Sequence, residues 1–87
     1  MSLRVSGVAR LANMGDGRAI LEVAGQRLFE LNRAAVSIWE KLEAGLPIQD
    51  IKSQVATEFG IPVQRAASDV EQFVEVLKDR LLLSDSD

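Results

Sequence analysis

Acidic side chains at helical spacing are one set of residues in this 87-residue chain that could take part in catalysis. Glu71 and Glu75 are four residues apart, as are Glu75 and Asp79, so each pair falls on one side of a helix. Paired carboxylates can act as general acid and base. These pairs, however, belong to a face that the pattern predicts to be solvated. We therefore expect no active site there.

Cysteine and histidine are both absent from the sequence. Without cysteine the chain has no thiolate nucleophile and no disulfide, and without either residue it lacks the usual ligands of zinc and iron-sulfur sites. Histidine is also the side chain whose ordinary pKa suits proton transfer near neutral pH. The sequence therefore predicts a protein that is not an enzyme and that holds no metal or cofactor.

A glycine-rich segment at residues 13–17, Asn-Met-Gly-Asp-Gly, is a further candidate for ion or phosphate binding. It lacks the spacing of oxygen ligands found in calcium loops and the lysine of phosphate-binding loops. We interpret it as a tight turn between two strands.

Composition indicates one globular domain, since 47% of the residues are hydrophobic and 26% are charged. No run approaches the ~18 apolar residues of a membrane span. The N-terminus carries no secretory signal, so we expect a cytoplasmic protein without a membrane partner. The domain is expected to occupy residues 1–83, and residues 84–87 are expected to form a frayed polar tail.

Charge is unevenly distributed along the chain. The segment that ends at Leu31 carries four arginines and three acidic residues, which gives it a net charge of +1. Because the whole chain has a net charge of −3, the residues after Leu31 carry a net charge of −4. Proteins that bind DNA use basic surfaces to neutralise phosphates. The acidic remainder therefore argues against a nucleic-acid partner.

Three strands are predicted in the first third of the chain, at residues 5–12, 18–23 and 26–31, and the first has the weakest pattern. Ala24-Gly25 suggests a two-residue hairpin between the second and the third. A regular ladder about this turn predicts four cross-strand pairs, which are Glu22 with Arg27, Ile20 with Phe29, Arg18 with Leu31 and Leu21 with Leu28. Phe29 and Leu31 are predicted to face the core.

Three helices are predicted in the remainder. Asn32 is a strong N-cap and joins the third strand directly to a helix over residues 33–44, which Gly45 ends and in which Trp39 is expected to be buried. A second helix is predicted to begin at Pro47 and to end at Gly60. The third helix begins at Val63 and its apolar stripe is predicted to reach Leu81.

One flank of the third helix carries an apolar residue outside that stripe. Asp69, Gln72, Val76 and Arg80 lie together on this flank. Two interpretations of Val76 remain open at this point: a half-buried residue at the margin of the core, or part of the lining of a groove.

Three strands followed by three helices predict an α+β fold of the winged helix-turn-helix kind. The third strand would then have an unpaired outer edge. An extended peptide could add to this edge as a fourth strand and place its side chains against the third helix. A covering loop or a homodimer formed through the same edge are the alternatives.

The chain resembles PqqD-like proteins, the RiPP recognition elements, over residues 28–83. The resemblance rests on the order and spacing of Leu31-Asn32, Ala35, Ile38-Trp39, Gly45, Ile51, Asp69-Val70, Phe73, Leu77 and Leu82-Leu83. It implies a domain without activity of its own that captures the leader of a ribosomally made precursor peptide and presents the peptide to a modifying enzyme or protease. The implied peptide-binding residues are Arg27, Leu28, Phe29, Glu30 and Leu31 on the strand and Asp69, Gln72, Val76 and Arg80 on the helix.

Two positions depart from the family pattern. Leu81 stands where the family usually has glycine, and Pro47 replaces a threonine-like cap. The chain also lacks the Pro-Glu-Gly step and the cysteine of pyrroloquinoline quinone pathway members, so the resemblance implies service to another peptide class, such as lasso peptides. The alternative functions are a winged-helix DNA-binding regulator and a dimeric assembly subunit, and salt-dependent binding to duplex DNA would distinguish the first.

Overall fold

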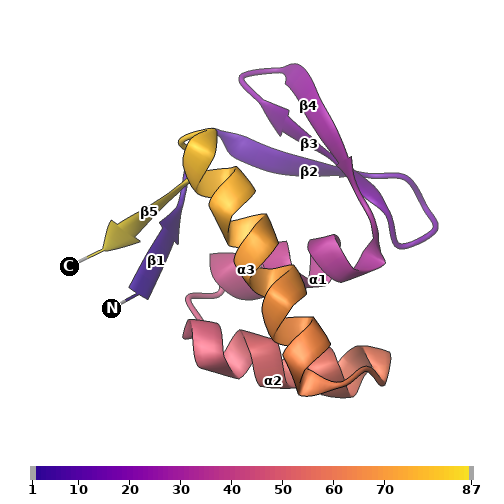
Figure 1. The fold of residues 1–87 in the computed structure, drawn as a ribbon. Coiled ribbons are helices and arrows are strands. Elements are labelled where there is room, and N and C mark those ends of the chain that lie inside the picture. The colour runs from indigo at the N-terminus through magenta and orange to yellow at the C-terminus, as the bar shows by residue number, and fades with distance from the viewer. Residues whose placement is uncertain (1, 87) are drawn as a thin grey trace.

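A computed structural model describes residues 2–86 of the chain, and its elements follow one another as β1, β2, β3, β4, α1, α2, α3 and β5 (Figure 1). Their bounds are β1 Ser2–Val5, β2 Ala9–Asn13, β3 Ala19–Val23, β4 Gln26–Leu31, α1 Arg33–Glu43, α2 Ile48–Phe59, α3 Val63–Asp79 and β5 Leu83–Ser86. Strands β2, β3 and β4 form an antiparallel sheet in that order, and the three helices follow it. The predicted α+β class and the order of its elements are confirmed.

The ladder between β3 and β4 contains a bulge that the sequence analysis did not predict. Glu22 pairs with Arg27 as expected, but Leu21 pairs with Phe29, Ile20 with Glu30 and Ala19 with Leu31. The predicted pairs of Leu21 with Leu28, Ile20 with Phe29 and Arg18 with Leu31 are therefore wrong. Leu28 is the extra residue of β4, which shifts the register by one on the side away from the turn.

The shift has a clear physical reason. A regular ladder would put Phe29 and Leu31 on the same face as Glu22 and Arg27, whereas the bulge moves them to the face of Leu21. That face packs on the core: Leu21 and Leu31 are buried there, and Phe29 is half-buried against them. The prediction that Phe29 and Leu31 face the core is thus confirmed, although by a different pairing.

The predicted two-residue turn joins β3 to β4. Ala24 and Gly25 both have positive φ, at 53° and 81°, which matches the mirror-image turns that fit the twist of a hairpin. Ala24 is strained in this conformation, as any residue with a Cβ atom is.

The helix boundaries agree closely with the sequence pattern. The Asn32 side chain accepts a hydrogen bond of 2.9 Å from the backbone N–H of Ala35, as expected of an N-cap. Gly45 and Gly60, both with positive φ, follow the ends of α1 and α2. Pro47 is the cap that precedes α2 rather than its first helical residue.

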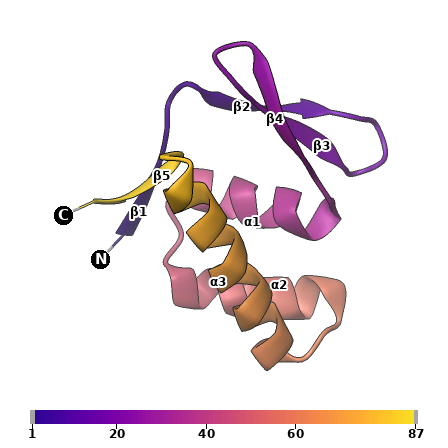
Figure 2. The same cartoon turned by 45° about the horizontal axis from the view of Figure 1, so that its top comes forward.

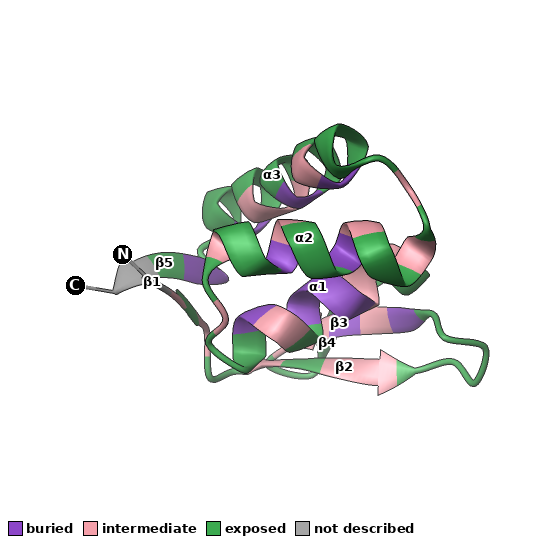
Figure 3. Ribbon diagram, turned by 90° about the horizontal axis from the view of Figure 1, so that it is seen from below, coloured by how far each residue is buried: buried purple, intermediate pink, exposed green. Residues whose placement is uncertain are grey.

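Helix α1 lies between the sheet and the pair formed by α2 and α3 (Figure 2, Figure 3). Trp39 of α1 is fully buried, as predicted, and so is Leu21 of the sheet. The buried stripes of α2 and α3, coloured purple in Figure 3, complete one hydrophobic core. The members of the core that these helices supply are Ile51, Val55, Ala66, Val70 and Leu77. Within residues 2–86, no helix has the length and apolarity that crossing a bilayer requires.

The two ends of the chain form a second sheet that corrects two predictions. Residues 83–86 are strand β5, antiparallel to β1, rather than a frayed tail, and residues 5–12 are not one strand but the end of β1, a turn and β2. Leu83 contributes a buried side chain and pairs with Val5. The remaining tail residue, Asp87, lies outside the described residues.

Leu81 is not part of the buried stripe of α3. The helix ends at Asp79, and Leu81 adopts a φ of +59° with 87% of its surface exposed. The turn brings Leu82 and Leu83 back into the core instead. Glycine would adopt this left-handed conformation without a steric penalty.

Candidate functional site: a strand edge and an adjoining groove

The outer edge of β4 is the first component of the candidate site. β4 is the last strand of its sheet, and within residues 2–86 no strand pairs with its other side. Its backbone N–H and C=O groups along that edge are therefore available to another extended chain. The strand continues through Asn32 into α1 without a linker, so the edge ends directly at the start of this helix.

A groove between α1 and α3 begins where β4 ends. Its volume is about 390 Å³, and its apolar surface comes from the start of α1 and from the middle of α3. Polar side chains border this surface. The apolar lining residues are Ala34, Ala35, Ile38, Phe73 and Val76, and the polar ones are Asn32, Arg65, Asp69 and Gln72.

The structure brings together three of the four helix residues that the sequence analysis selected. Asp69, Gln72 and Val76 line the same groove. Arg80 does not line it, since it follows the end of α3 as its cap. Val76 is 44% exposed and outside the buried core, so of its two interpretations the groove lining fits the observed position.

The five strand residues selected from the sequence divide between two faces and the edge. Arg27 and Glu30 are exposed on the outer face, Phe29 and Leu31 turn inward, and Leu28 is 38% exposed at the bulge. The part of β4 that a peptide could contact is therefore chiefly backbone.

The groove residues of α1 and Asn32 were not selected from the sequence, and neither were two groove residues of α3, Arg65 and Phe73. Arg65 precedes Asp69 by one helical turn, and Phe73 lies one turn before Val76 and one turn after Asp69. Their helical spacing from Asp69 and Val76 is the signal in the sequence that could have identified them. Phe73 is half-buried and contacts both the core and the groove.

The loop between β2 and β3 fixes the position of β4 and α1. Asp16 accepts hydrogen bonds from the backbone N–H of Arg18, at 3.1 Å, and from its guanidinium, at 2.8 Å, which lowers the pKa of Asp16. Arg18 also donates to Glu30 of β4 at 2.9 Å, and Arg33 of α1 donates to the backbone carbonyl of Asp16 at 2.8 Å. The segment 13–17 is a structural connection, and within residues 2–86 no cluster of side chains could hold a metal ion.

The carboxylate pairs of α3 are on the molecular surface. Glu71 and Glu75 are both exposed, and Glu71 accepts a hydrogen bond of 2.7 Å from Lys52 of α2. A contact of this kind joins two helices and leaves neither carboxylate in an enclosed site. Glu71 and Glu75 therefore lie on a solvated face of α3, as the sequence pattern predicts.

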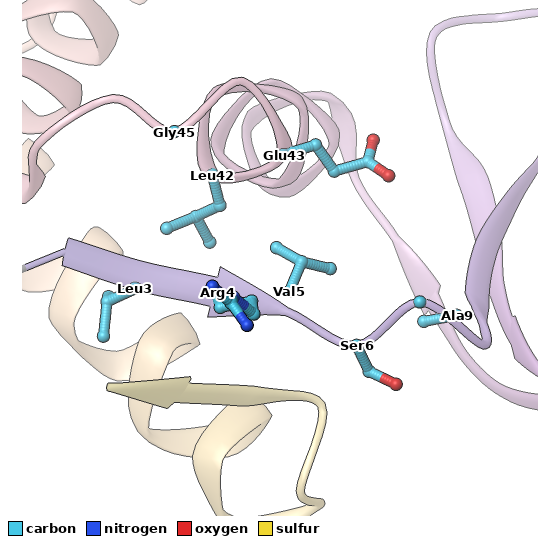
Figure 4. A pocket seen from close by; sticks show the side chains of 9 residues that line it. Leu3, Arg4, Val5, Ser6, Ala9, Leu42, Glu43 and Gly45 are labelled. Atoms are coloured by element: carbon cyan, nitrogen blue, oxygen red, sulfur yellow. The ribbon is translucent and has the colours of Figure 1, made fainter. Parts of the chain in front are cut away.

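A second hollow, of about 420 Å³, lies between β1 and the C-terminal end of α1 (Figure 4). Leu42 of α1 and Val5 of β1 point toward each other across it, and Glu43 lies at its margin. None of the residues selected from the sequence lines this hollow. It is separate from the edge of β4 and the groove.

Comparisons with known proteins agree with the architecture. One solved structure, described as TbiB1 in complex with the TbiA(beta) leader peptide, superposes with a TM-score of 0.80 at 22% sequence identity, and the match covers 97% of this chain and 98% of that chain. A search of curated proteins finds no match. The model of the family described as coenzyme PQQ synthesis protein D (PqqD) matches residues 17–83, which span β3, β4 and all three helices. The chain therefore belongs to the PqqD family.

Proposed function

We propose that this protein is a non-catalytic recognition element for the leader segment of a ribosomally synthesised precursor peptide. The leader adds to the outer edge of β4 as a further antiparallel or parallel strand, with side chains directed toward α3. The observation that carries the proposal is the continuity of the site: an unpaired strand edge runs through Asn32 into a groove with both polar and apolar lining, which includes Asp69, Gln72 and Val76. Family membership and the leader-peptide complex of the structural neighbour support it.

The two components of the site contribute different things to binding. The β4 edge offers backbone hydrogen bonds, which hold any extended chain and provide little selectivity. The groove supplies selectivity, because Ile38, Phe73 and Val76 favour an apolar side chain of the leader while Arg65 and Asp69 can pair with flanking charges. A leader of ~10 residues with two or three such anchors would bind with micromolar to nanomolar affinity.

The bound leader would leave the rest of the precursor free for a partner enzyme. Neither thiol nor imidazole is present in the chain, so modification or cleavage of the precursor is assigned to that partner. We infer a modifying enzyme or a protease of the same pathway, and a precursor of a class such as the lasso peptides.

NMR titration tests this placement. Isotopically labelled protein is titrated with the N-terminal half of a candidate precursor peptide. The expected result is a shift of the backbone amide signals of residues 27–31 together with those of Asp69, Gln72 and Val76. The C-terminal half of the same precursor and a duplex DNA serve as controls, and neither should shift these signals. Unshifted signals of residues 27–31 at saturating leader would contradict strand addition.

A further inference from the structure

The bulge in β4 places two opposite charges on the same side of a free strand edge. In a regular strand, residues three apart point to opposite faces. Arg27 and Glu30 nevertheless share a face, because they pair with Glu22 and Ile20, which are two residues apart in β3. Both side chains are exposed.

This arrangement is self-complementary. An antiparallel pair of two β4 strands, centred between Leu28 and Phe29, sets Arg27 of each copy opposite Glu30 of the other. The two residues between these charges form no side-chain pair across the ladder, because Phe29 turns inward to the core and Leu28 is the exposed residue of the bulge. Opposite charges directly across an antiparallel ladder are stabilising, and a twofold axis repeats the contact between Arg27 and Glu30.

We propose that β4 pairs with β4 of a second copy of this chain, and that the resulting dimer competes with the leader peptide for the same edge. The competition rests on the proposed function, whereas the self-pairing does not. In this dimer the backbone edge is covered in the absence of peptide, as exposed edges commonly are in stable proteins.

The charged groups are suitably placed for this contact. Arg27 takes part in no ion pair among the side chains that the structure describes. Glu30 bonds to Arg18 through Oε1 alone, so the second carboxylate oxygen can accept from the partner copy. A bulge ordinarily discourages edge pairing, but here both strands carry the same bulge and the number of residues between the charges is equal on the two sides.

The dimer is expected to be weak. Each β4 strand contributes six residues, and an interface of this length buries less than the ~1,200 Å² of a typical stable complex. A leader that forms the same backbone bonds and also fills the groove has additional anchors, so it displaces the second copy. Self-pairing would thus reduce the apparent affinity for peptides that lack those anchors.

Charge reversal with recombination tests the self-pairing. Sedimentation equilibrium over a range of concentrations measures the dimer dissociation constant of the wild-type chain, of Arg27→Glu and of Glu30→Arg. In the homodimer of either variant, both cross-strand pairs of residues 27 and 30 have like charges. We therefore expect its dissociation constant to be at least about tenfold higher than that of the wild-type dimer. In an equimolar mixture of the two variants every cross-strand pair is again opposite in charge, and the heterodimer is expected to form at least as tightly as the wild-type dimer.

Several results would overturn the proposal. They are a wild-type chain that stays monomeric at the highest soluble concentration, variants that dimerise as the wild type does, and a mixture that stays monomeric. Thermal unfolding is measured for both variants as a control that they are folded. The competition is measured separately: the leader should convert the wild-type dimer to monomers, and a dimer that binds leader without dissociating would refute it. If the chain dimerises as expected but does not bind the leader, the proposed function is refuted and the self-pairing is not.

Discussion

Leu81 combines an unfavourable backbone conformation with an unfavourable environment. Its φ of +59° is in the left-handed region, and the residue, with its apolar side chain, is 87% exposed to water. Glycine adopts this conformation without a steric penalty. The turn that Leu81 occupies is nevertheless required, because it directs Leu82 and Leu83 into the core.

Leu81→Gly is therefore expected to stabilise the fold. Removing the left-handed strain, ~1–2 kcal/mol, outweighs the greater entropy of glycine in the unfolded chain, so we expect a net gain of about 0.5–1 kcal/mol. Denaturant unfolding measures it. Leu82→Ala is the matched control, and because Leu82 is buried it should lose roughly 2–5 kcal/mol. A loss of stability in Leu81→Gly would show that the side chain has a packing role.

At the scale of the elements, a polar contact holds α1 against α2. Ser37 donates to Glu58 at 2.6 Å, and Lys41 donates to both of them, at 2.6 Å to the Ser37 hydroxyl and at 2.9 Å to the Glu58 carboxylate. Ser37 is buried although it is polar, and this contact satisfies it. The Ser37 hydroxyl, and then the Lys41 ammonium, lower the pKa of Glu58 below its usual 4.5.

The lowered pKa predicts how stability depends on pH. A carboxyl group with a lower pKa in the folded state stabilises the fold above the unfolded-state value, and this contribution disappears as the pH falls through the folded-state value. Glu58→Gln should therefore lower the free energy of unfolding at pH 7, by about 0.5–1 kcal/mol because the group is largely in water. As the pH falls below 4.5 and through the lower folded-state pKa of Glu58, the variant and the wild type should converge. Chemical unfolding at several pH values measures the difference, and an equal loss at all pH values would contradict the prediction.

The sheet shows what could and could not be predicted from the sequence. The Ala24-Gly25 turn fixes the pairing of Glu22 with Arg27, and turn chemistry alone predicts it. The bulge at Leu28 depends on a longer-range requirement, namely that Leu21, Phe29 and Leu31 all face α1. Local pairing rules contain no term for this requirement, so the register beyond the turn was wrong.

The helices were easier to predict for the same reason. Their caps, Asn32, Gly45 and Gly60, are local and act through the backbone of adjacent residues. The position of Val76 outside the buried stripe also followed from helical periodicity, which is how this part of the candidate site was found. Arg65 and Phe73 were missed because they are groove residues only through the approach of α1 to α3.

At the scale of the whole molecule, β1 and β5 bring the two ends of the chain together beside the helices (Figure 1). Both strands are short, and β5 has the composition of a solvated tail, so no local pattern predicts their pairing. Leu83 anchors β5 in the core, and the Ser6 N–H donates to the carbonyl of Leu82 at 2.9 Å. The sheet formed by β1 and β5 lies apart from β4, so it leaves the outer edge of β4 uncovered.

The separation of core and groove on α3 allows binding to be tested independently of folding. Val76 and Val63 are both exposed valines of this helix, 44% and 54% respectively, but only Val76 lines the groove. Val76→Asp places a charge near Asp69 that the bound leader would bury, so we expect the affinity for the leader to fall at least about tenfold. The free energy of unfolding should change by less than ~0.5 kcal/mol. Val63→Asp introduces the same charge at the start of the helix and should leave affinity unchanged. Isothermal titration with the leader and thermal unfolding measure the two quantities. If Val76→Asp instead lowered the unfolding temperature as strongly as a core substitution, Val76 would belong to the core and the groove would lose its apolar anchor.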